Sequence, residues 1–144
     1  MPKVSEIIDK KGGDVATVGR EDTAIRAVEI MNERRIGAVV VVNDGKVVGI
    51  FTERDLLNRI VAKGLDAATT PVKDVMSTPV ACCQLSTDLT EAQSVMTNKR
   101  VRHLPVVEGD DLVGIVSIGD LMARQVTDQK NTIRYLNEYL YGRA

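Results

Sequence analysis

The chain has 144 residues, 44% of them hydrophobic and 27% charged, which is the composition of a folded globular domain. Its 19 basic and 20 acidic side chains give a net charge of −1, so a basic surface for nucleic acid or anionic lipid is not expected. No apolar run approaches the roughly 20 residues that cross a bilayer, and the first residues do not resemble a signal peptide. We therefore expect a protein that binds neither nucleic acid nor membrane.

The sequence is poor in groups that form disulfides or bind metals. Its two cysteines, Cys82 and Cys83, are neighbours, and a disulfide between adjacent residues is strained. We therefore expect reduced thiols and a cytoplasmic protein. A single histidine and the lack of a spaced cysteine pair fall short of the usual ligands of a zinc site, so no metal site is predicted.

A tandem repeat dominates the chain. The segment VVGIFTERDL at residues 47–56 is followed by LVGIVSIGDL at residues 112–121. Gly49 and Gly114 are 65 residues apart, and the same offset holds without a gap back to Val15. Self-similarity at a fixed offset indicates a duplicated structural unit.

The repeat gives the domain boundaries. We assign repeat 1 to residues 1–65 and repeat 2 to residues 72–122, joined through the connector GLDAATTP at residues 64–71. Residues 123–144 are expected to form a C-terminal helix that extends repeat 2. Because a unit of about 60 residues buries little surface by itself, we expect the two repeats to share one core.

Repeat 1 predicts the order β-α-β-β-α. A short β segment at 15–18 precedes an amphipathic helix that Asp22 or Thr23 can cap. The β-branched run at 38–42 is too short for a helix and predicts a strand. The Asn-Asp-Gly sequence that follows is typical of a hairpin turn, and a second helix is expected to begin at Thr52.

Repeat 2 predicts the same elements in the same order. A β segment is expected at 80–83, a helix from 86–88 onward, a strand at 104–107 and a second helix from Ser117. The sequence therefore predicts an α+β fold in which two β-α-β-β-α repeats pack with pseudo-twofold symmetry.

One short element recurs at the junction of strand and helix. It runs from Gly49 through Thr52 to Asp55, and it returns 65 residues later with Ser117 and Asp120. The hydroxyl and the carboxylate, three residues apart, are close to a helix capping box. The same groups suit a nucleotide, because a helix N-terminus attracts phosphate and a carboxylate can accept from both hydroxyls of a ribose. The sequence leaves both interpretations open.

The repeat, with GIFTERDL, RHLPVV and GIVSIGDL, resembles a tandem pair of cystathionine-β-synthase (CBS) domains, a Bateman module of the stand-alone prokaryotic type. The resemblance covers nearly the whole chain. It implies a disc-like sensor that binds an adenosine-containing ligand (AMP, ADP, ATP, NAD or S-adenosylmethionine) in clefts between the repeats. It also implies a regulatory module with no catalytic residues and no catalytic cofactor.

The resemblance further implies a set of ligand-binding residues. Asp55 and Asp120 would hold ribose hydroxyls, while Thr52 and Ser117 would contact phosphate or ribose. The other expected contacts come from the entering strands, the base pocket and the phosphate-binding side chains: Thr17, Val18, Cys82 and Cys83; Val40, Val41, Pro105 and Val106; and Arg54, Arg100, Arg102 and His103.

The two expected sites differ in charge. Repeat 1 has Gly-Ala at 37–38 where repeat 2 has Arg-His at 102–103. Repeat 2 has Ile-Gly at 118–119 where repeat 1 has Glu-Arg at 53–54. We therefore expect one of the sites to favour a phosphorylated ligand.

The last helix is expected to be long. Its pattern continues from Ser117 to about Tyr141, with Gly142 as the stop. Its apolar residues, which include Ile133, can pack against the N-terminal segment around Val4 or against a second copy of the chain. We expect a homodimer, the commonest symmetric assembly.

The sequence offers no activated nucleophile and no general base with an orienting partner, so we expect no enzyme activity. An unidentified regulated protein is a possible partner. Two alternatives stay open at this point: a structural dimerisation module with degenerate pockets, and a detached regulatory domain of an inosine-monophosphate-dehydrogenase-like enzyme. The second alternative requires another polypeptide to carry the catalytic domain.

Overall fold

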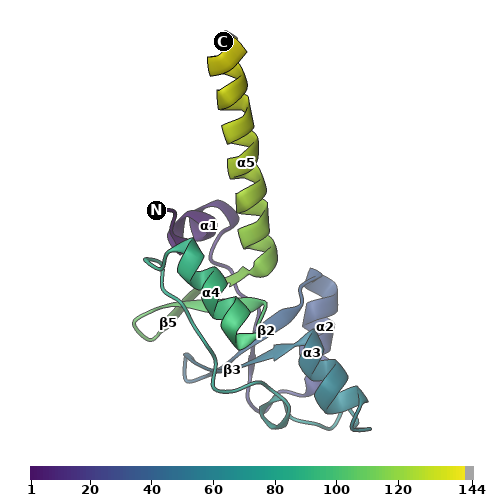
Figure 1. The fold of residues 1–144 in the computed structure, drawn as a ribbon. Helices are drawn as coiled ribbons and strands as arrows, with labels where there is room; N and C mark the ends of the chain where they lie inside the picture. Colours follow the sequence, from purple (N-terminus) through teal and green to yellow (C-terminus); the bar gives the residue numbers. More distant parts are fainter. Residues whose placement is uncertain (142–144) are drawn as a thin grey trace.

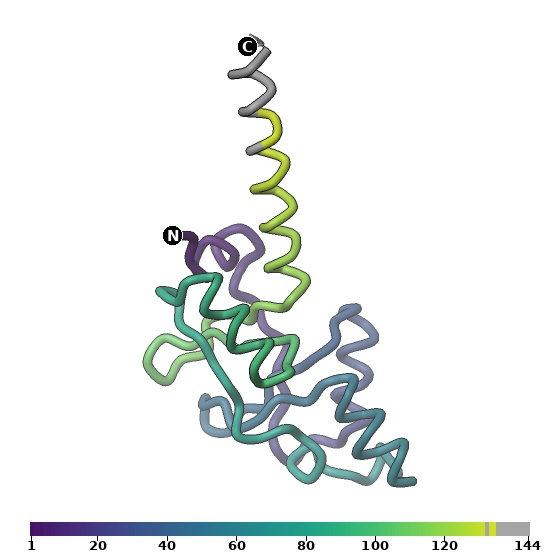
Figure 2. Tube along the Cα trace, viewed as in Figure 1, coloured from purple at the N-terminus to yellow at the C-terminus, as the bar shows by residue number. Residues whose placement is uncertain are grey.

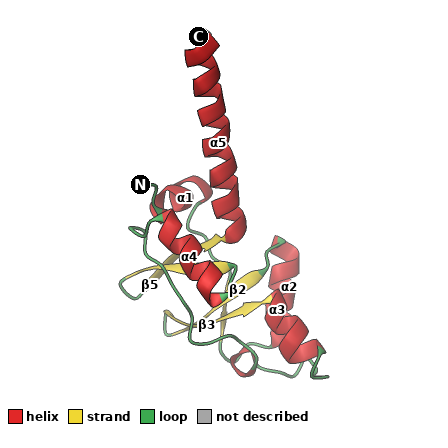
Figure 3. Ribbon diagram, viewed as in Figure 1, coloured by secondary structure: helices red, strands yellow, loops and turns green. Residues whose placement is uncertain are grey.

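The structure is a computed structural model that describes the backbone of residues 1–141 and the side chains of residues 1–131, 133 and 134. Figure 1 shows the elements, and Figure 3 distinguishes helix from strand. The elements are α1 (Val4–Lys11), β1 (Thr17–Gly19), α2 (Ala24–Arg34), β2 (Ala38–Asn43), β3 (Lys46–Thr52), α3 (Glu53–Asp55), the π-helical η1 (Leu56–Val61), the 3-10 turn η2 (Val72–Asp74), α4 (Leu89–Lys99), β4 (His103–Glu108), β5 (Asp111–Ser117) and α5 (Ile118–Tyr141).

The two repeats have matching hairpins. Strands β2 and β3 pair antiparallel, as do β4 and β5, and each hairpin has an irregularity at the same place, after Val41 and after Val106. In the first hairpin Asp44 and Gly45 both have positive φ, as a two-residue turn between twisted strands requires. Strands β3 and β5 lie in contact where the repeats meet. The predicted pseudo-symmetric α+β fold is confirmed.

The first strand of repeat 2 is a correction to the sequence prediction. In repeat 1, β1 runs parallel to β2, and Val40 donates its N–H to the carbonyl of Ala16 at 3.1 Å. The residue at the position of Val40 in repeat 2 is Pro105, which has no N–H to donate. The predicted strand at 80–83 is therefore reduced to one bridge, in which Cys83 pairs with Val106.

The core consists of two clusters, whereas we expected one. In each repeat the sheet packs its apolar face against helices, and each cluster also takes in a segment that precedes the sheet of the other repeat, α1 in the second cluster and η2 in the first. Phe51, Val39 and Met31 belong to the first cluster, and Leu104, Val116 and Met96 belong to the second. Each sheet therefore buries its helix-facing side in its own cluster, and the opposite faces remain to form the boundary between repeats.

Helix α1 lies within the residues assigned to repeat 1 but packs against repeat 2. Val4, Ile7 and Ile8 are buried in the second cluster. A Cβ on Gly114 of β5 would lie 2.6 Å from Cδ1 of Ile8, so the contact needs glycine there. Figure 2 shows α1 beside the start of α5, two segments far apart in the sequence.

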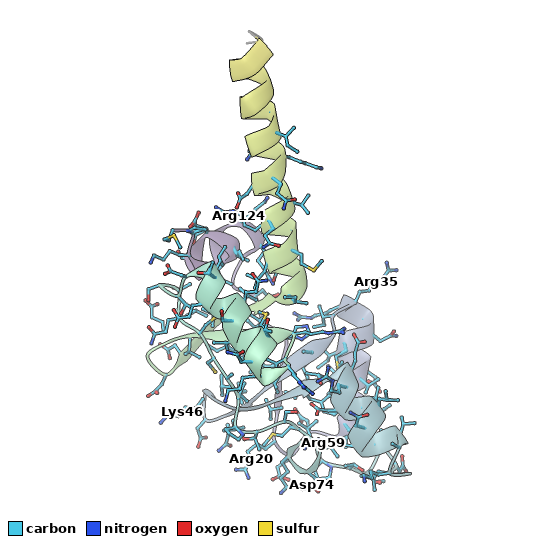
Figure 4. All side chains as sticks on the ribbon, viewed as in Figure 1. Arg20, Arg35, Lys46, Arg59, Asp74 and Arg124 are labelled. Atoms are coloured by element: carbon cyan, nitrogen blue, oxygen red, sulfur yellow. The ribbon has the colours of Figure 1, made fainter. Side chains whose placement is uncertain are left out.

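Ion pairs fasten α1 to this position. Arg124 of α5 contacts Glu6 at 3.0 Å, and Lys3 contacts Asp88, the residue that precedes α4, at 2.8 Å. Figure 4 shows Arg124 next to α1. The start of α5 therefore packs against the N-terminal segment, but Ile133 of the expected apolar stripe does not, since it is 60% exposed.

The rest of α5 projects away from both repeats (Figure 1). Ile133 is exposed on this part of the helix. Gly142, the expected stop, lies outside the described residues. No helix among the residues that the structure describes is long and apolar enough to cross a membrane.

Each long helix that covers a sheet ends in a left-handed residue. Arg35 follows α2 with φ 54°, and Arg100 follows α4 with φ 56°. Glycine adopts this conformation without the steric cost that a Cβ brings. Both repeats therefore carry an arginine where the backbone alone favours glycine.

We predict that Arg35→Gly stabilises the protein by about 0.5–1 kcal/mol, because it removes the left-handed Cβ clash at a small entropic cost. The free energy of unfolding from urea titration measures this effect. The matched control is Glu29→Gly at an exposed position in the middle of α2, which should destabilise by about 1 kcal/mol. Equal destabilisation by both changes would contradict the prediction.

Candidate functional site

A cavity of about 600 Å³ lies between the two repeats. Its walls come from the β3–α3 junction of repeat 1, from the segment that leads into repeat 2, and from the start of β4. The lining residues are Gly37, Ile50, Thr52, Glu53, Arg54, Asp55, Leu57, Asn58, Ser77, Pro79, Val80, Ala81, Arg100, Val101, Arg102 and His103.

Asp55 is the buried charge of this cavity, with 4% of its surface exposed. The backbone N–H of Thr52 donates to Oδ2 of Asp55 at 3.0 Å, and Oγ1 of Thr52 accepts from the N–H of Asp55 at 3.3 Å. These two reciprocal bonds form the predicted capping box. The turn therefore fixes the carboxylate in place before any ligand arrives.

The other oxygen of Asp55 also has partners. Ser77 donates its hydroxyl to Oδ1 at 2.8 Å, and Nε of Arg59 lies 3.4 Å from the same atom. Ser77 belongs to the cavity wall, whereas Arg59 reaches Asp55 from the next turn of the helix. A hydroxyl entering from the cavity could replace the Ser77 hydroxyl, which is free to rotate about its single bond.

Three exposed arginines lie around the cavity: Arg54 from repeat 1, and Arg100 and Arg102 from repeat 2. Arg54 donates from Nη1 to the carbonyl of Arg100 at 3.0 Å, so one hydrogen bond of this group crosses between the repeats. Guanidinium groups bind phosphate and carboxylate oxygens with two parallel hydrogen bonds. The surroundings of the cavity therefore suit an anionic group.

His103 lies half-buried in the wall, close to Glu53. Burial lowers the pKa of its imidazole, while the Glu53 and Asp120 carboxylates oppose that shift. Gly37 leaves the space between these side chains open, because a Cβ there would lie 2.7 Å from Oε1 of Glu53 and 3.4 Å from Cε1 of His103. Because burial lowers its pKa, the His103 imidazole is predominantly neutral at pH 7, and the open space beside Gly37 lets it act as a hydrogen-bond partner.

Six of the residues predicted from the sequence line this cavity. They are Thr52, Arg54, Asp55, Arg100, Arg102 and His103. Their convergence brings together the strand-to-helix element of repeat 1 and the RHLPVV segment of repeat 2.

The other predicted residues lie elsewhere, and their roles at a ligand stay predictions. Residues in register across a hairpin share a face, so Val40 lies on the face of Ile50, a cavity residue, and Pro105 on that of Ile115. The remaining residues divide by environment: Val18, Val41, Cys83 and Val106 lie in the two cores, Cys82 is exposed, Thr17 lines a separate hollow of about 280 Å³, and Ser117 and Asp120 lie at the second junction.

The sequence prediction missed the segment that leads into repeat 2. Ser77, Pro79, Val80 and Ala81 all line the cavity. Ser77 is anchored there by two backbone hydrogen bonds to Ile50, at 2.8 and 3.0 Å. The available signal was position alone, because this segment must pass from one repeat to the other and so lies at their boundary.

The second junction repeats the capping geometry of the first. The N–H of Ser117 donates to Oδ2 of Asp120 at 2.9 Å, and the hydroxyl of Ser117 accepts from the N–H of Asp120 at 3.1 Å. Here, however, the ammonium of Lys11 lies 2.8 Å from Oδ2 of Asp120. The two equivalent carboxylates therefore have different neighbours.

The cysteines are poor nucleophiles. Burial raises the pKa of Cys83 to about 11 and also raises the pKa of Cys82. Both thiols are therefore protonated near neutral pH. Within the described part of the chain, no group of three or more histidine, cysteine, aspartate or glutamate side chains could hold a metal ion.

Known proteins resemble this chain over most of its length. The CBS domain family model matches residues 4–62 and 72–126. The CBS domain-containing protein YhcV of Bacillus subtilis is 36% identical over 126 residues, which cover 88% of this chain and 89% of that protein. An inosine-5'-monophosphate dehydrogenase of Methanocaldococcus jannaschii is 36% identical over 127 residues, but these make up only 24% of the enzyme.

Solved structures share the fold. A putative signal-transduction protein with CBS domains from Burkholderia ambifaria superposes with a TM-score of 0.85 at 35% identity, covering 88% of this chain and 96% of that chain. The CBS domain pair of MJ0100, solved in complex with 5-methylthioadenosine and S-adenosyl-L-methionine, superposes with a TM-score of 0.77 at 21% identity, covering 90% and 98%. The two matched segments, the common fold and the shared sequence place this chain in the CBS domain family, as a tandem CBS pair.

Proposed function

We propose that this CBS pair is a regulatory module that binds an adenine nucleotide in the cavity at Asp55. The observation that carries the proposal is a buried, pre-positioned carboxylate in a cavity that both repeats build and that exposed arginines surround. A volume of about 600 Å³ lies within the range of small-molecule sites.

The cavity offers a partner to each part of a nucleotide. The Asp55 carboxylate accepts from the vicinal hydroxyls of the ribose, taking the place of the Ser77 hydroxyl on Oδ1. Ile50, Val80 and Ala81 supply apolar surface for the adenine. The arginines receive the phosphate.

The MJ0100 complex supports the choice of an adenosine ligand. That protein has the same fold and holds two adenosine derivatives. Because its sequence identity to this chain is low, the support is that the fold can accommodate adenosine. The phosphate is inferred from the arginines of this chain alone.

Regulation follows from the position of the cavity. Its walls belong to both repeats, so a nucleotide bound there contacts both and favours one relative arrangement of them. An arrangement that the ligand favours can in turn change the affinity for a partner protein by the same coupling free energy. Since the cavity contains no activated nucleophile or oriented base, we propose binding and no catalysis.

We propose that a second copy of the chain binds the surface formed by η1 and the start of α5. Four exposed apolar side chains occur as two pairs related by the repeat: Leu57 (61%) with Met122 (58%), and Val61 (63%) with Val126 (48%). One symmetric contact can cover both pairs, because the pseudo-twofold axis presents η1 and α5 as equivalent edges.

We predict that Asp55→Asn abolishes the thermal stabilisation that AMP gives the wild type. A ligand at 100 times its Kd contributes about 2.7 kcal/mol, which raises Tm by roughly 5–10 °C for a protein of this size. The amide keeps an oxygen for the helix cap but cannot accept from two ribose hydroxyls. Differential scanning fluorimetry with AMP measures the effect.

The control for this change is Asp88→Asn, which alters another aspartate before a helix but lies away from the cavity. Asp88→Asn should retain the full AMP shift. An equal AMP shift in Asp55→Asn and the wild type would contradict nucleotide binding at Asp55 and favour a structural dimerisation module.

We predict that Val61→Glu and Val126→Glu together convert the dimer to a monomer, because each buries a charge in the proposed contact. Light scattering coupled to size exclusion measures the mass. Thr127→Glu, on another face of α5, is the control and should remain a dimer. A wild type that already elutes as a monomer would refute the dimer.

A further inference from the structure

The two strand-to-helix junctions present the same carboxylate differently. At both junctions the N–H of the residue three positions earlier donates to the aspartate carboxylate, and its hydroxyl accepts from the aspartate N–H. The Asp120 side chain is 25% exposed, against 5% for that of Asp55. By geometry, then, the chain has a second position that could receive a ribose.

Lys11 takes up that position. Its ammonium is 2.8 Å from Oδ2 of Asp120, and it comes from the end of α1. In the other repeat Met76 covers Gly49 as Ile8 of α1 covers Gly114, so Ile8 and Met76 are equivalent. Seven positions separate Ile8 from Val15, against four from Met76 to Val80, and Lys11 extends to Asp120 from this longer segment.

The approach of Lys11 differs from that of the arginine next to Asp55. Arg59 reaches Asp55 from the following turn of the same helix and does not line the cavity. Lys11 instead lies between Ile8 and Val15, and the equivalent segment, between Met76 and Val80, contributes Ser77 and Pro79 to the wall of the Asp55 cavity. The lysine therefore enters from the side on which a ligand would lie.

The position of Lys11 is fixed by the rest of α1. Val4, Ile7 and Ile8 are buried in the second core, and Glu6 is held by Arg124 at 3.0 Å. The Lys11 side chain itself remains 35% exposed, so its ammonium can leave Asp120 without unpacking the helix. The Lys11 ammonium can therefore leave the Asp120 carboxylate while α1 and the carboxylate stay in place.

We propose that Lys11 restricts this chain to one nucleoside site by occupying Asp120 as an internal cation. The proposal rests on the proposed function of the Asp55 cavity, because it assumes that the capped carboxylate is the group that holds a ribose. Lys11 neutralises the Asp120 carboxylate and accounts for one of the hydrogen bonds that a ribose would make.

Equilibrium dialysis with adenosine tests the proposal. Adenosine is the suitable probe because the second junction has glycines where the first has Arg54 and Arg102, so a phosphate would gain less there. The wild type should bind one adenosine per chain, and Lys11→Met should bind two. Lys11→Arg, which keeps the cation, should bind one, as should Lys10→Met, the control on the same exposed helix end.

Two further variants locate the second adenosine. In Lys11→Met, adding Asp55→Asn should leave one adenosine, and adding Asp120→Asn should also leave one. One adenosine in both the wild type and Lys11→Met overturns the role of Lys11 but not the proposed function, and so does a wild type that binds two. Binding to Lys11→Met with none to the wild type overturns the proposed function but supports the role of Lys11, and no binding to either overturns both.

Discussion

At the end of β3 the carboxylate of Asp55 caps a helix while lying almost out of contact with water. A buried carboxylate needs hydrogen bonds, and here the backbone of Thr52, its hydroxyl, the Ser77 hydroxyl and Arg59 supply them. The arrangement serves the fold, because it ends a strand and begins a helix. It also serves binding, because it places an acceptor for hydroxyl groups at the boundary of two repeats.

The duplicated sequence contains this capping box twice, and the neighbouring segments give the two carboxylates different ion-pair partners. Arg59 and Arg124 occupy equivalent positions, but Arg59 turns back to Asp55, whereas Arg124 contacts Glu6 of α1. Because Arg124 contacts Glu6, the ion-pair partner of Asp120 is Lys11, which lies on α1 as Glu6 does. Helix α1 therefore accounts for much of the difference between the two junctions, although by sequence it belongs to repeat 1.

The repeat and its capping residues could be predicted because they depend on local rules. A hydroxyl three residues before an acid predicts a helix start, and the start observed after Thr52 is the predicted one. The loss of the first strand of repeat 2 could also have been predicted, since Pro105 occupies the position at which Val40 donates its N–H in repeat 1. The packing of α1 could not be predicted, because an amphipathic pattern shows that a helix has an apolar face but does not show which sheet that face covers.

The walls of the cavity were harder to predict than its carboxylate. In β2 four consecutive residues are buried, so the apolar run has no polar side to show which residues face the helices. Val41 lies in a core while Val40 shares a face with Ile50, yet the sequence treats the two valines alike. The segment around Ser77 carries no chemical signature of binding, and only the three-dimensional structure brings it to Asp55.

A crystal structure of the chain grown with AMP tests the central claim most directly. The account predicts nucleotide in the cavity between the repeats, with both ribose hydroxyls on the Asp55 carboxylate and the Ser77 hydroxyl displaced from Oδ1. The phosphate should lie among Arg54, Arg100 and Arg102. Nucleotide bound only at Asp120, or a cavity that stays empty at saturating AMP while Ser77 remains on Asp55, would contradict it.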